Sequence, residues 1–123
     1  MDKNPCVFCS CREYVSENKL AFAIYDKYPV SPGHMLIIPK RHVSSFFATT
    51  AEEEAALLDL LVECREVLIH ERQPDGFNVG INDGQPAGQT VMHLHIHLIP
   101  RYIGDIENPK GGVRGVIPEK RVY

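Results

Sequence analysis

Residues 88–101 read Gly-Gln-Thr-Val-Met-His-Leu-His-Ile-His-Leu-Ile-Pro-Arg and hold three of the chain's six histidines, His93, His95 and His97. Aliphatic residues alternate with them, which predicts a half-buried β-strand. Successive side chains of a strand point to opposite faces, so the imidazoles are expected on one face. The other face is expected to enter a core with the aliphatic set Leu94, Ile96, Leu98 and Ile99. Because strand propensity alone would favour Thr or Val at exposed positions, the row of imidazoles indicates a functional site.

Length and composition predict one domain, spanning residues 1–123, with its own core. The formal net charge of −3 does not favour a general nucleic-acid or anionic-membrane surface. No apolar run approaches membrane-spanning length, and the first residues lack the apolar segment of a signal peptide. A cytoplasmic location is therefore expected. There, the four cysteines are expected to be metal ligands or buried thiols rather than disulfides.

Three further strands and one helix are predicted from the pattern. The apolar run at 20–25 and the strand at 34–39 flank a Pro-Val-Ser-Pro-Gly turn, which predicts an antiparallel hairpin. Residues 77–81 form a third strand, and a loop at 82–88 leads into the histidine strand. The Gly-rich tail at 102–123 is expected to be irregular. It is either a loose terminus or a segment that wraps onto a partner or an anionic ligand.

The long helix is predicted at residues 50–72. Thr50 and Glu53 have the spacing of a capping box, and acidic residues follow in the first turn. The expected buried stripe consists of Leu57, Leu61, Cys64 and Leu68. Cys64 is therefore interpreted as a buried structural thiol, and His70, on the opposite face, as a surface residue.

The cysteine pair Cys6 and Cys9 has the Cys-x-x-Cys spacing of a zinc half-site. A thioredoxin-like redox pair is the functional rival, although no strand precedes the motif to place it at a helix start. Two ordinary thiols are the third interpretation, and Cys11 is a possible additional ligand. Zinc requires four ligands, so the pair needs partners from elsewhere in the chain.

The histidine row supports two kinds of chemistry. Histidines at i and i+2 of a strand can share a catalytic metal. However, a strand rises about 3.3 Å per residue, so His93 and His97 are roughly 13 Å apart and one ion does not easily reach all three. No Asp or Glu follows at a spacing that would complete the site. Alternatively, imidazole is a good nucleophile at neutral pH and can form a covalent phosphoramidate with a phosphoryl group. A second imidazole can donate hydrogen bonds to the phosphate or a proton to the leaving group. The phosphoryl chemistry is favoured.

Residues 89–99 resemble the signature of the histidine triad (HIT) family, His-φ-His-φ-His-φ-φ with φ apolar, and match it completely. Residues 26–42 resemble the family's other familiar stretch, so the resemblance covers about residues 5–101. It implies an α+β fold with an antiparallel sheet of about five strands, helices packed against it, and a homodimer that joins two sheets. It also implies binding of a nucleoside monophosphate moiety, with cleavage between its α-phosphate and a leaving group.

The resemblance assigns roles to individual residues. His95 would attack the α-phosphate and form a nucleotidyl-histidine intermediate, and His97 would contact the phosphate and assist the leaving group. The phosphate site would include Gln89, Thr90 and Gly88. Asp26 would hold the ribose hydroxyls, and Asn82 would reach the ribose or phosphate. His34 is interpreted as structural. An intact third histidine favours hydrolysis over nucleotidyl transfer, and no catalytic metal is needed.

Some members of the family, mostly bacterial-looking ones, hold a structural zinc, and the resemblance implies the same site here from Cys6, Cys9, His42 and His93. The tail resembles those of dinucleoside polyphosphate hydrolases, whereas another branch hydrolyses nucleoside phosphoramidates. Lys110 and Arg114 would then contact distal phosphates or remain solvated. The expected activity is hydrolysis of an adenosine phosphate derivative. The alternatives are transfer by the same chemistry, a nucleotide-binding module with little turnover, and a metalloenzyme.

Overall fold

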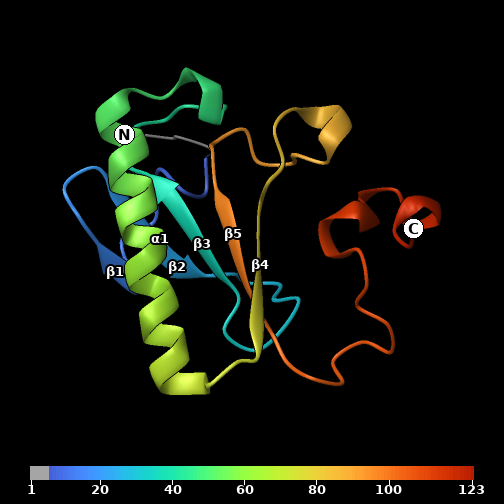
Figure 1. Cartoon of the computed structure of the whole chain (residues 1–123). Coiled ribbons are helices and arrows are strands. Elements are labelled where there is room, and N and C mark those ends of the chain that lie inside the picture. Colours follow the sequence, from blue (N-terminus) through green and yellow to red (C-terminus); the bar gives the residue numbers. More distant parts are fainter. Residues whose placement is uncertain (1–5) are drawn as a thin grey trace.

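A five-stranded antiparallel sheet with one long helix against it forms the fold, as Figure 1 shows for the computed structural model, which describes residues 6–123. The strand order is β1-β2-β3-β5-β4, and every neighbouring pair is antiparallel. The predicted α+β class is therefore confirmed. The strands are β1 (Ser16–Glu17), β2 (Ala21–Tyr25), β3 (Met35–Pro39), β4 (Gly76–Ile81) and β5 (Ile96–Arg101), and the helix is α1 (Ala51–Arg72).

The predicted hairpin is formed by β2 and β3, whose register runs from Ala21 opposite Pro39 to Tyr25 opposite Met35. Gly33 closes the connecting turn with a φ of 92°. A Cβ at this position would also lie 2.9 Å from the side chain of Leu68. The turn therefore requires glycine both for its backbone conformation and for the approach of α1.

The helix begins at the predicted capping box, in which Thr50 accepts from the Glu53 N–H and Glu53 accepts from the Thr50 N–H. The expected position of Leu61 in the buried stripe was wrong. Leu61 is only partly buried, and the stripe consists of Leu57, Leu60, Cys64 and Leu68. Burial raises the pKa of the Cys64 thiol to about 11, as expected of an inert structural thiol. His70 is exposed, as predicted.

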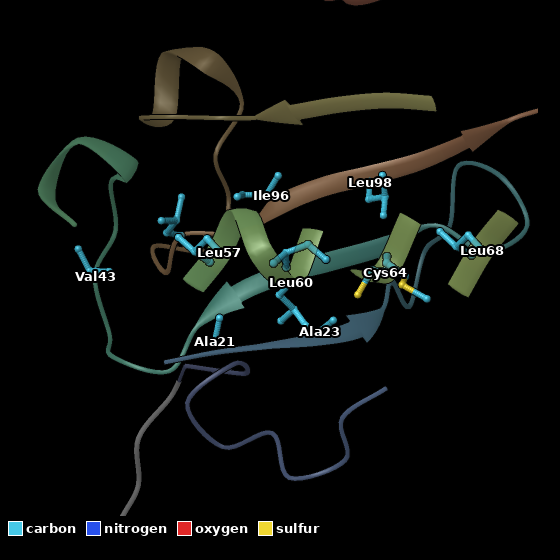
Figure 2. Packing of buried hydrophobic residues seen from close by; sticks show 12 residues of the cluster. Ala21, Ala23, Val43, Leu57, Leu60, Cys64, Leu68, Ile96 and Leu98 are labelled. Atoms are coloured by element: carbon cyan, nitrogen blue, oxygen red, sulfur yellow. The ribbon is translucent and has the colours of Figure 1, made fainter. Parts of the chain in front are cut away.

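The main core lies between α1 and one face of the sheet (Figure 2). There the helix stripe meets alternate residues of the strands, namely Ala21, Ala23, Met35, Ile37, Leu94, Ile96 and Leu98. The intervening strand residues form a second cluster on the opposite face, composed of Phe8, Phe22, Leu36 and Ile38. The histidines also belong to this opposite face, because His97 pairs with Leu36 and Gly80.

The histidine strand is shorter than its alternating pattern. β5 starts only at Ile96. The residues before it contact the loop that follows β3, where the Leu94 N–H donates to the Val43 carbonyl at 2.7 Å. Leu94, Ile96 and Leu98 are buried in the core as predicted. Ile99 is not in the core, since it pairs with Asn78 on the histidine face and lines a cavity there. The prediction that Ile99 enters the core was wrong, because Ile99 is two residues after His97 and therefore points to the same face as the histidines.

Short 3-10 helices complete the chain: η1 (Phe46–Ala48), η2 (Gln85–Ala87), η3 (Gly112–Val116) and η4 (Pro118–Lys120). The last two belong to the tail, which folds on itself. Arg121 donates to the carbonyls of Asn108 and Lys110, both at 2.6 Å, and Arg114 donates to the Lys120 carbonyl at 2.9 Å. Within the described residues, no helix has the length and apolar character needed to cross a bilayer.

Candidate active site

His95 presents one ring nitrogen to the outside of the sheet and has the other fixed. Its Nδ1 lies 2.8 Å from the carbonyl oxygen of His93. A carbonyl can only accept, so Nδ1 carries the proton, and the neutral ring has its lone pair on Nε2. The backbone of the residue two positions earlier thus selects the tautomer that a nucleophile requires.

His97 lies beside His95, with ring centroids 5.1 Å apart, and its tautomer is set through a relay. The N–H of Val30 donates to Nδ1 of His34 at 3.0 Å, so neutral His34 carries its proton on Nε2. That Nε2 faces His97 Nδ1 at 3.0 Å and Asp26 Oδ2 at 3.5 Å. When His34 donates to His97, the neutral His97 ring has its own proton on Nε2, where it can donate to a ligand.

The environment keeps His97 neutral. Burial, followed by the nearby His95 and His34, lowers the pKa of His97 to about 4. Burial also lowers the pKa of His34, against the opposing effect of Asp26. At neutral pH this pair therefore consists of two uncharged imidazoles, and His97 acts first as a hydrogen-bond donor.

A cavity of about 580 Å³ opens next to His97. Asp26, His34, Asn82 and His97 line it together with the aliphatic side chain of Ile99. The residue opposite His97 on β4 is Gly80, and a Cβ there would meet no atom within 4 Å. The tail supplies one wall through Gly112, Val113, Gly115 and Val116. Neither Lys110 nor Arg114 lines the cavity; both lie over the ring of Tyr123.

The loop before the histidines is tied together by Gln89, whose side chain is buried. Its Oε1 accepts from the Gly84 N–H at 2.8 Å, and its Nε2 donates to the carbonyls of Ser44 and Val91. Gln89 therefore positions the loop, and its expected contact with a phosphate stays a prediction. The Gly88 N–H donates to the Gln85 carbonyl, and a Cβ added to Gly88 would lie 3.9 Å from the side-chain nitrogen of Asn82. Thr90 is exposed at the end of this loop.

Cys6, Cys9, His42 and His93 come together as a second group on this side of the sheet. Their ligand atoms all lie within 4.8 Å of one another. The Cys9 Sγ is 3.2 Å from His42 Nδ1, and the Cys6 Sγ is 3.3 Å from His93 Nδ1. Two donors of one tetrahedral zinc ion are separated by roughly 3.3–3.8 Å, so the spacing and the Cys₂His₂ chemistry fit zinc. Cys11 is not part of the group.

His93 has the tautomer that a metal ligand needs. It is fully buried, and its Nε2 donates to the Pro39 carbonyl at 2.8 Å. The Nδ1 lone pair is thereby directed at the two sulfurs, in the usual arrangement of a ligand oriented by a backbone carbonyl. The main-chain carbonyl of His93 also accepts from His95, so His93 connects the Cys₂His₂ group to the His95 ring.

Asp26, His34 and His97 also lie close enough to share an ion. This group has no thiolate and lines the cavity, so a catalytic metal ion, if the protein used one, would bind here. In the present arrangement His34 and His97 are joined by a hydrogen bond, and the Asp26 carboxylate lies 3.5 Å from the same His34 nitrogen.

The contact of His34 with His97 was not predicted from the sequence. A structural role was expected, but the ring lies against His97 and Asp26. The hairpin register could have revealed half of this, because Asp26 and His34 flank the turn and are joined by a backbone hydrogen bond of 2.9 Å. The other half depends on β3 pairing with β5, which no local pattern predicts. Phe8, which packs on His93 and His95, was also missed.

Comparison with known proteins identifies the class. Residues 11–104 match the HIT domain family, and the chain belongs to that family. A HIT family protein from Bacillus anthracis has a similar structure, with a TM-score of 0.76 and 37% identity over 81% of this chain and 75% of that one. A zinc-bound histidine triad protein from Mycobacterium smegmatis gives a TM-score of 0.75 and 33% identity over 84% of this chain and 79% of that one.

Two relatives carry the names of nucleotide-processing enzymes. A bis(5'-adenosyl)-triphosphatase from Dictyostelium discoideum is 42% identical over 90 residues, covering 73% of this chain and 60% of that protein. An AP-4-A phosphorylase from Mycobacterium tuberculosis is 39% identical over 92 residues, covering 74% of this chain and 47% of that protein. The chain thus spans about half the length of the phosphorylase and three fifths of the triphosphatase.

Proposed function

We propose that this protein is a nucleotide hydrolase that cleaves at the α-phosphate of an adenosine phosphate derivative, such as a dinucleoside polyphosphate. The observation that carries the proposal is the pair of fixed tautomers. His95 offers a lone pair on Nε2, and His97, 5.1 Å away between centroids, offers an N–H on its own Nε2. A nucleophile beside a neutral donor suits in-line displacement at phosphorus.

In the first step, Nε2 of His95 attacks the α-phosphorus. A P–N bond forms, and the bond from phosphorus to the leaving group breaks and gives its electron pair to that group. The Nε2–H of His97 donates to a phosphate oxygen and stabilises the charge that develops there. The leaving group takes a proton from His97 or from water. Water then attacks the nucleotidyl-histidine, which releases the nucleoside monophosphate and restores His95.

The remaining site residues bind and orient the substrate in this proposal. Both Asp26 and Asn82 lie on the wall of the cavity. Asp26 accepts hydrogen bonds from the ribose hydroxyls, and Asn82 contacts the ribose or a phosphate oxygen. Gly88 and Thr90 lie at the phosphate, and Gln89 holds their loop in place. Because the N–H groups of Gly88 and Gln89 donate to carbonyls within the loop, the phosphate needs other donors, of which Thr90 is one.

A zinc ion held by Cys6, Cys9, His42 and His93 would have a structural role. It would tie the N-terminal segment to the residue whose carbonyl orients His95. The donor set supports this proposal, and so does the zinc-bound relative of known structure. We also propose a cytoplasmic homodimer without a nucleic-acid or membrane partner, in line with the family resemblance.

The function is tested with a substrate panel of diadenosine tetraphosphate, diadenosine triphosphate and an adenosine phosphoramidate, with product identification. His95→Ala should abolish turnover, whereas His70→Ala, on the exposed face of α1, should not change it. Labelled adenosine monophosphate trapped on wild type by an alkaline denaturing quench, which preserves a P–N bond, would identify the intermediate. If no substrate turns over although adenosine monophosphate binds tightly, the protein is a nucleotide-binding module instead. Preference for the phosphoramidate, or transfer to an added acceptor, would select the alternative branches of the same chemistry.

Metal analysis tests the zinc site. About one zinc per chain is expected, and Cys9→Ser should lose it, whereas Cys11→Ser should retain it because Cys11 lies outside the group. A zinc-free native protein would contradict the site. Loss of turnover on chelation, with the fold and the His95 tautomer unchanged, would favour a catalytic ion at Asp26, His34 and His97. Sedimentation analysis measures the dimer directly.

A further inference from the structure

The loop that holds the cysteine pair also packs against the nucleophile. Phe8 lies between Cys6 and Cys9, and its side chain is buried. Its ring centroid is 5.1 Å from that of His95, with an interplanar angle of 64°. It is also 5.8 Å from the His93 ring, at 89°. Both contacts have the edge-to-face geometry that aromatic rings prefer.

Three groups contact the His95 ring: the His93 carbonyl, the His97 ring and the Phe8 ring. Phe8 forms no hydrogen bond with His95 and has no part in the proposed chemistry. The His93 carbonyl fixes Nδ1, and the His97 ring contacts another side at an angle of 65°. A single hydrogen bond leaves an imidazole able to tilt about the bond that attaches its ring, so packing must supply the remaining restraint. Displacement of a reacting group by about 1 Å can cost about 100-fold in rate.

Phe8 is itself held at two levels. Its ring belongs to the second core cluster with Phe22, Leu36 and Ile38. Its backbone sits in a turn with two hydrogen bonds of its own, from the Ser10 N–H to the Cys6 carbonyl and from the Cys11 N–H to the Phe8 carbonyl, each 3.2 Å. The described part of this loop pairs with no strand of the sheet. Cys6 and Cys9, on either side of Phe8, bring this loop to His42 and His93, because the four ligand atoms lie within 4.8 Å of one another.

We infer that Phe8 is a positioning residue for His95, and that the Cys6–Cys9 group holds Phe8 in place. The metal group would then influence catalysis at the adjacent site without touching the substrate. This inference rests on the proposed function for its kinetic consequence, but the contact between Phe8 and His95 can be examined without any substrate.

A matched control separates positioning from general core packing. Phe22 belongs to the same cluster and is 2% exposed, yet its ring stacks on Tyr14 at 4.3 Å. Phe8→Leu and Phe22→Leu remove similar buried area, so similar losses of stability are expected. Only Phe8→Leu and Phe8→Ala should affect His95.

The kinetic experiment compares kcat and KM for wild type, Phe8→Ala, Phe8→Leu and Phe22→Leu, all with bound zinc verified. Phe8→Ala should lower kcat about 10- to 100-fold while KM and the affinity for adenosine monophosphate change less than about twofold. Phe8→Leu should recover much of the loss, and Phe22→Leu should retain the wild-type kcat. A change confined to KM would overturn the inference and indicate substrate contact. An equal loss of kcat in Phe22→Leu would also overturn it.

The direct readout is the imidazole ¹H–¹⁵N spectrum of His95 at one fixed pH. Wild type should show a single protonated Nδ1 signal, and Phe8→Ala should show a shifted or broadened one. Removal of zinc from wild type with a chelator, well below the unfolding temperature of the metal-free form, should shift or broaden the His95 signal in the same way. The same treatment of Phe8→Ala should change its His95 signal little further. An unchanged signal in Phe8→Ala refutes the positioning role, and an unchanged signal on chelation refutes the tether. A protein with the expected spectra but no turnover would refute the proposed function alone.

Discussion

The ion pair between Arg41 and Glu53 fixes the segment that carries His42, and its contribution can be measured with Glu53→Gln. Arg41 donates to both carboxylate oxygens of Glu53, at 2.8 and 2.9 Å. Glu53 is buried at the start of α1, and Arg41 immediately precedes His42. Glutamine at the third helical position can still accept from the Thr50 N–H, so the substitution removes the charge but retains the capping box.

The magnitude follows from the pKa of Glu53. Hydrogen bonds from Arg41, with a smaller contribution from the Thr50 backbone, lower that pKa from 4.5 to about 2. At about 1.4 kcal/mol per pKa unit, this difference corresponds to about 3 kcal/mol at neutral pH. The Arg41 side chain is 53% exposed, so solvent screens the pair. We therefore expect Glu53→Gln to lower the free energy of unfolding by about 1–2 kcal/mol.

The pH dependence gives the prediction its sign. A carboxyl whose pKa is lowered by folding stabilises the protein above about pH 4.5, and this stabilisation is lost as the pH falls toward about 2. Urea unfolding of wild type and Glu53→Gln should thus give curves that differ at pH 7 and converge near pH 2. Zinc and protein concentrations must be held constant, because both change apparent stability. Equal stability at pH 7, or a difference that persists unchanged at pH 2, would refute the reasoning.

Three further predictions concern the cavity, the catalytic pair and the tail. Gly80→Leu should raise KM at least about tenfold, because the new side chain would project into the cavity beside His97, and it should leave the free energy of unfolding within about 0.5 kcal/mol. His97→Gln should reduce the loss of unfolding free energy that wild type shows as the pH falls. The wild-type His97 binds its proton only near pH 4 when folded, but near 6.5 when unfolded, so wild-type stability falls as the pH drops from 6.5 to about 4. The expected difference over that window, measured by urea unfolding, is about 1–3 kcal/mol. Gly111→Ala should release the tail and speed its proteolysis, because Gly111 has a φ of 91° and its Cβ would clash with the Arg121 carbonyl.

Each of these has a matched control. Gly76 also lies on β4 with open space around it, but it does not line the cavity, so Gly76→Leu should leave KM unchanged. His70→Gln should leave the acid limb of the stability curve as in wild type. Gly104 has a similar φ of 87° with no atom near its Cβ, so Gly104→Ala tests the backbone strain without the clash. A control that behaves like its partner variant would contradict the corresponding prediction.

Local signals account for the parts of the fold that the sequence predicted. The capping box at Thr50 and the turn at Gly33 depend on residues close in the chain, so their patterns were sufficient for the helix and the hairpin. The alternating histidines likewise predicted a row on one face. β1 has only two residues, too few for any period to be recognised. In the helix, Leu60 and Leu61 both fit an apolar stripe, and only the position of the sheet decides between them.

Long-range pairing accounts for what the sequence could not provide. The proposed zinc ligands Cys6 and His93 are 87 residues apart, and only the family resemblance grouped them before the structure did. His34 and His97 are 63 residues apart and meet because β3 pairs with β5 rather than with β4, the next strand in the chain. The contact of Phe8 with His95 likewise joins residues from opposite ends of the chain. No spacing rule within a short window contains this information.

The pairing of β3 with β5 also has a consequence for how the molecule matures during synthesis. The chain between them holds α1 and β4, so the centre of the sheet closes only after residues 96–101 have emerged. Until then the nascent chain carries Cys6, Cys9 and His42 without the fourth ligand, and His34 without its partner. Contacts between distant residues form later than local ones, because the entropic cost of closing the long intervening loop must first be overcome. We therefore expect tight zinc binding to begin only when the sheet closes. Zinc retained by nascent chains on stalled ribosomes would then report whether residues 96–101 have joined the sheet.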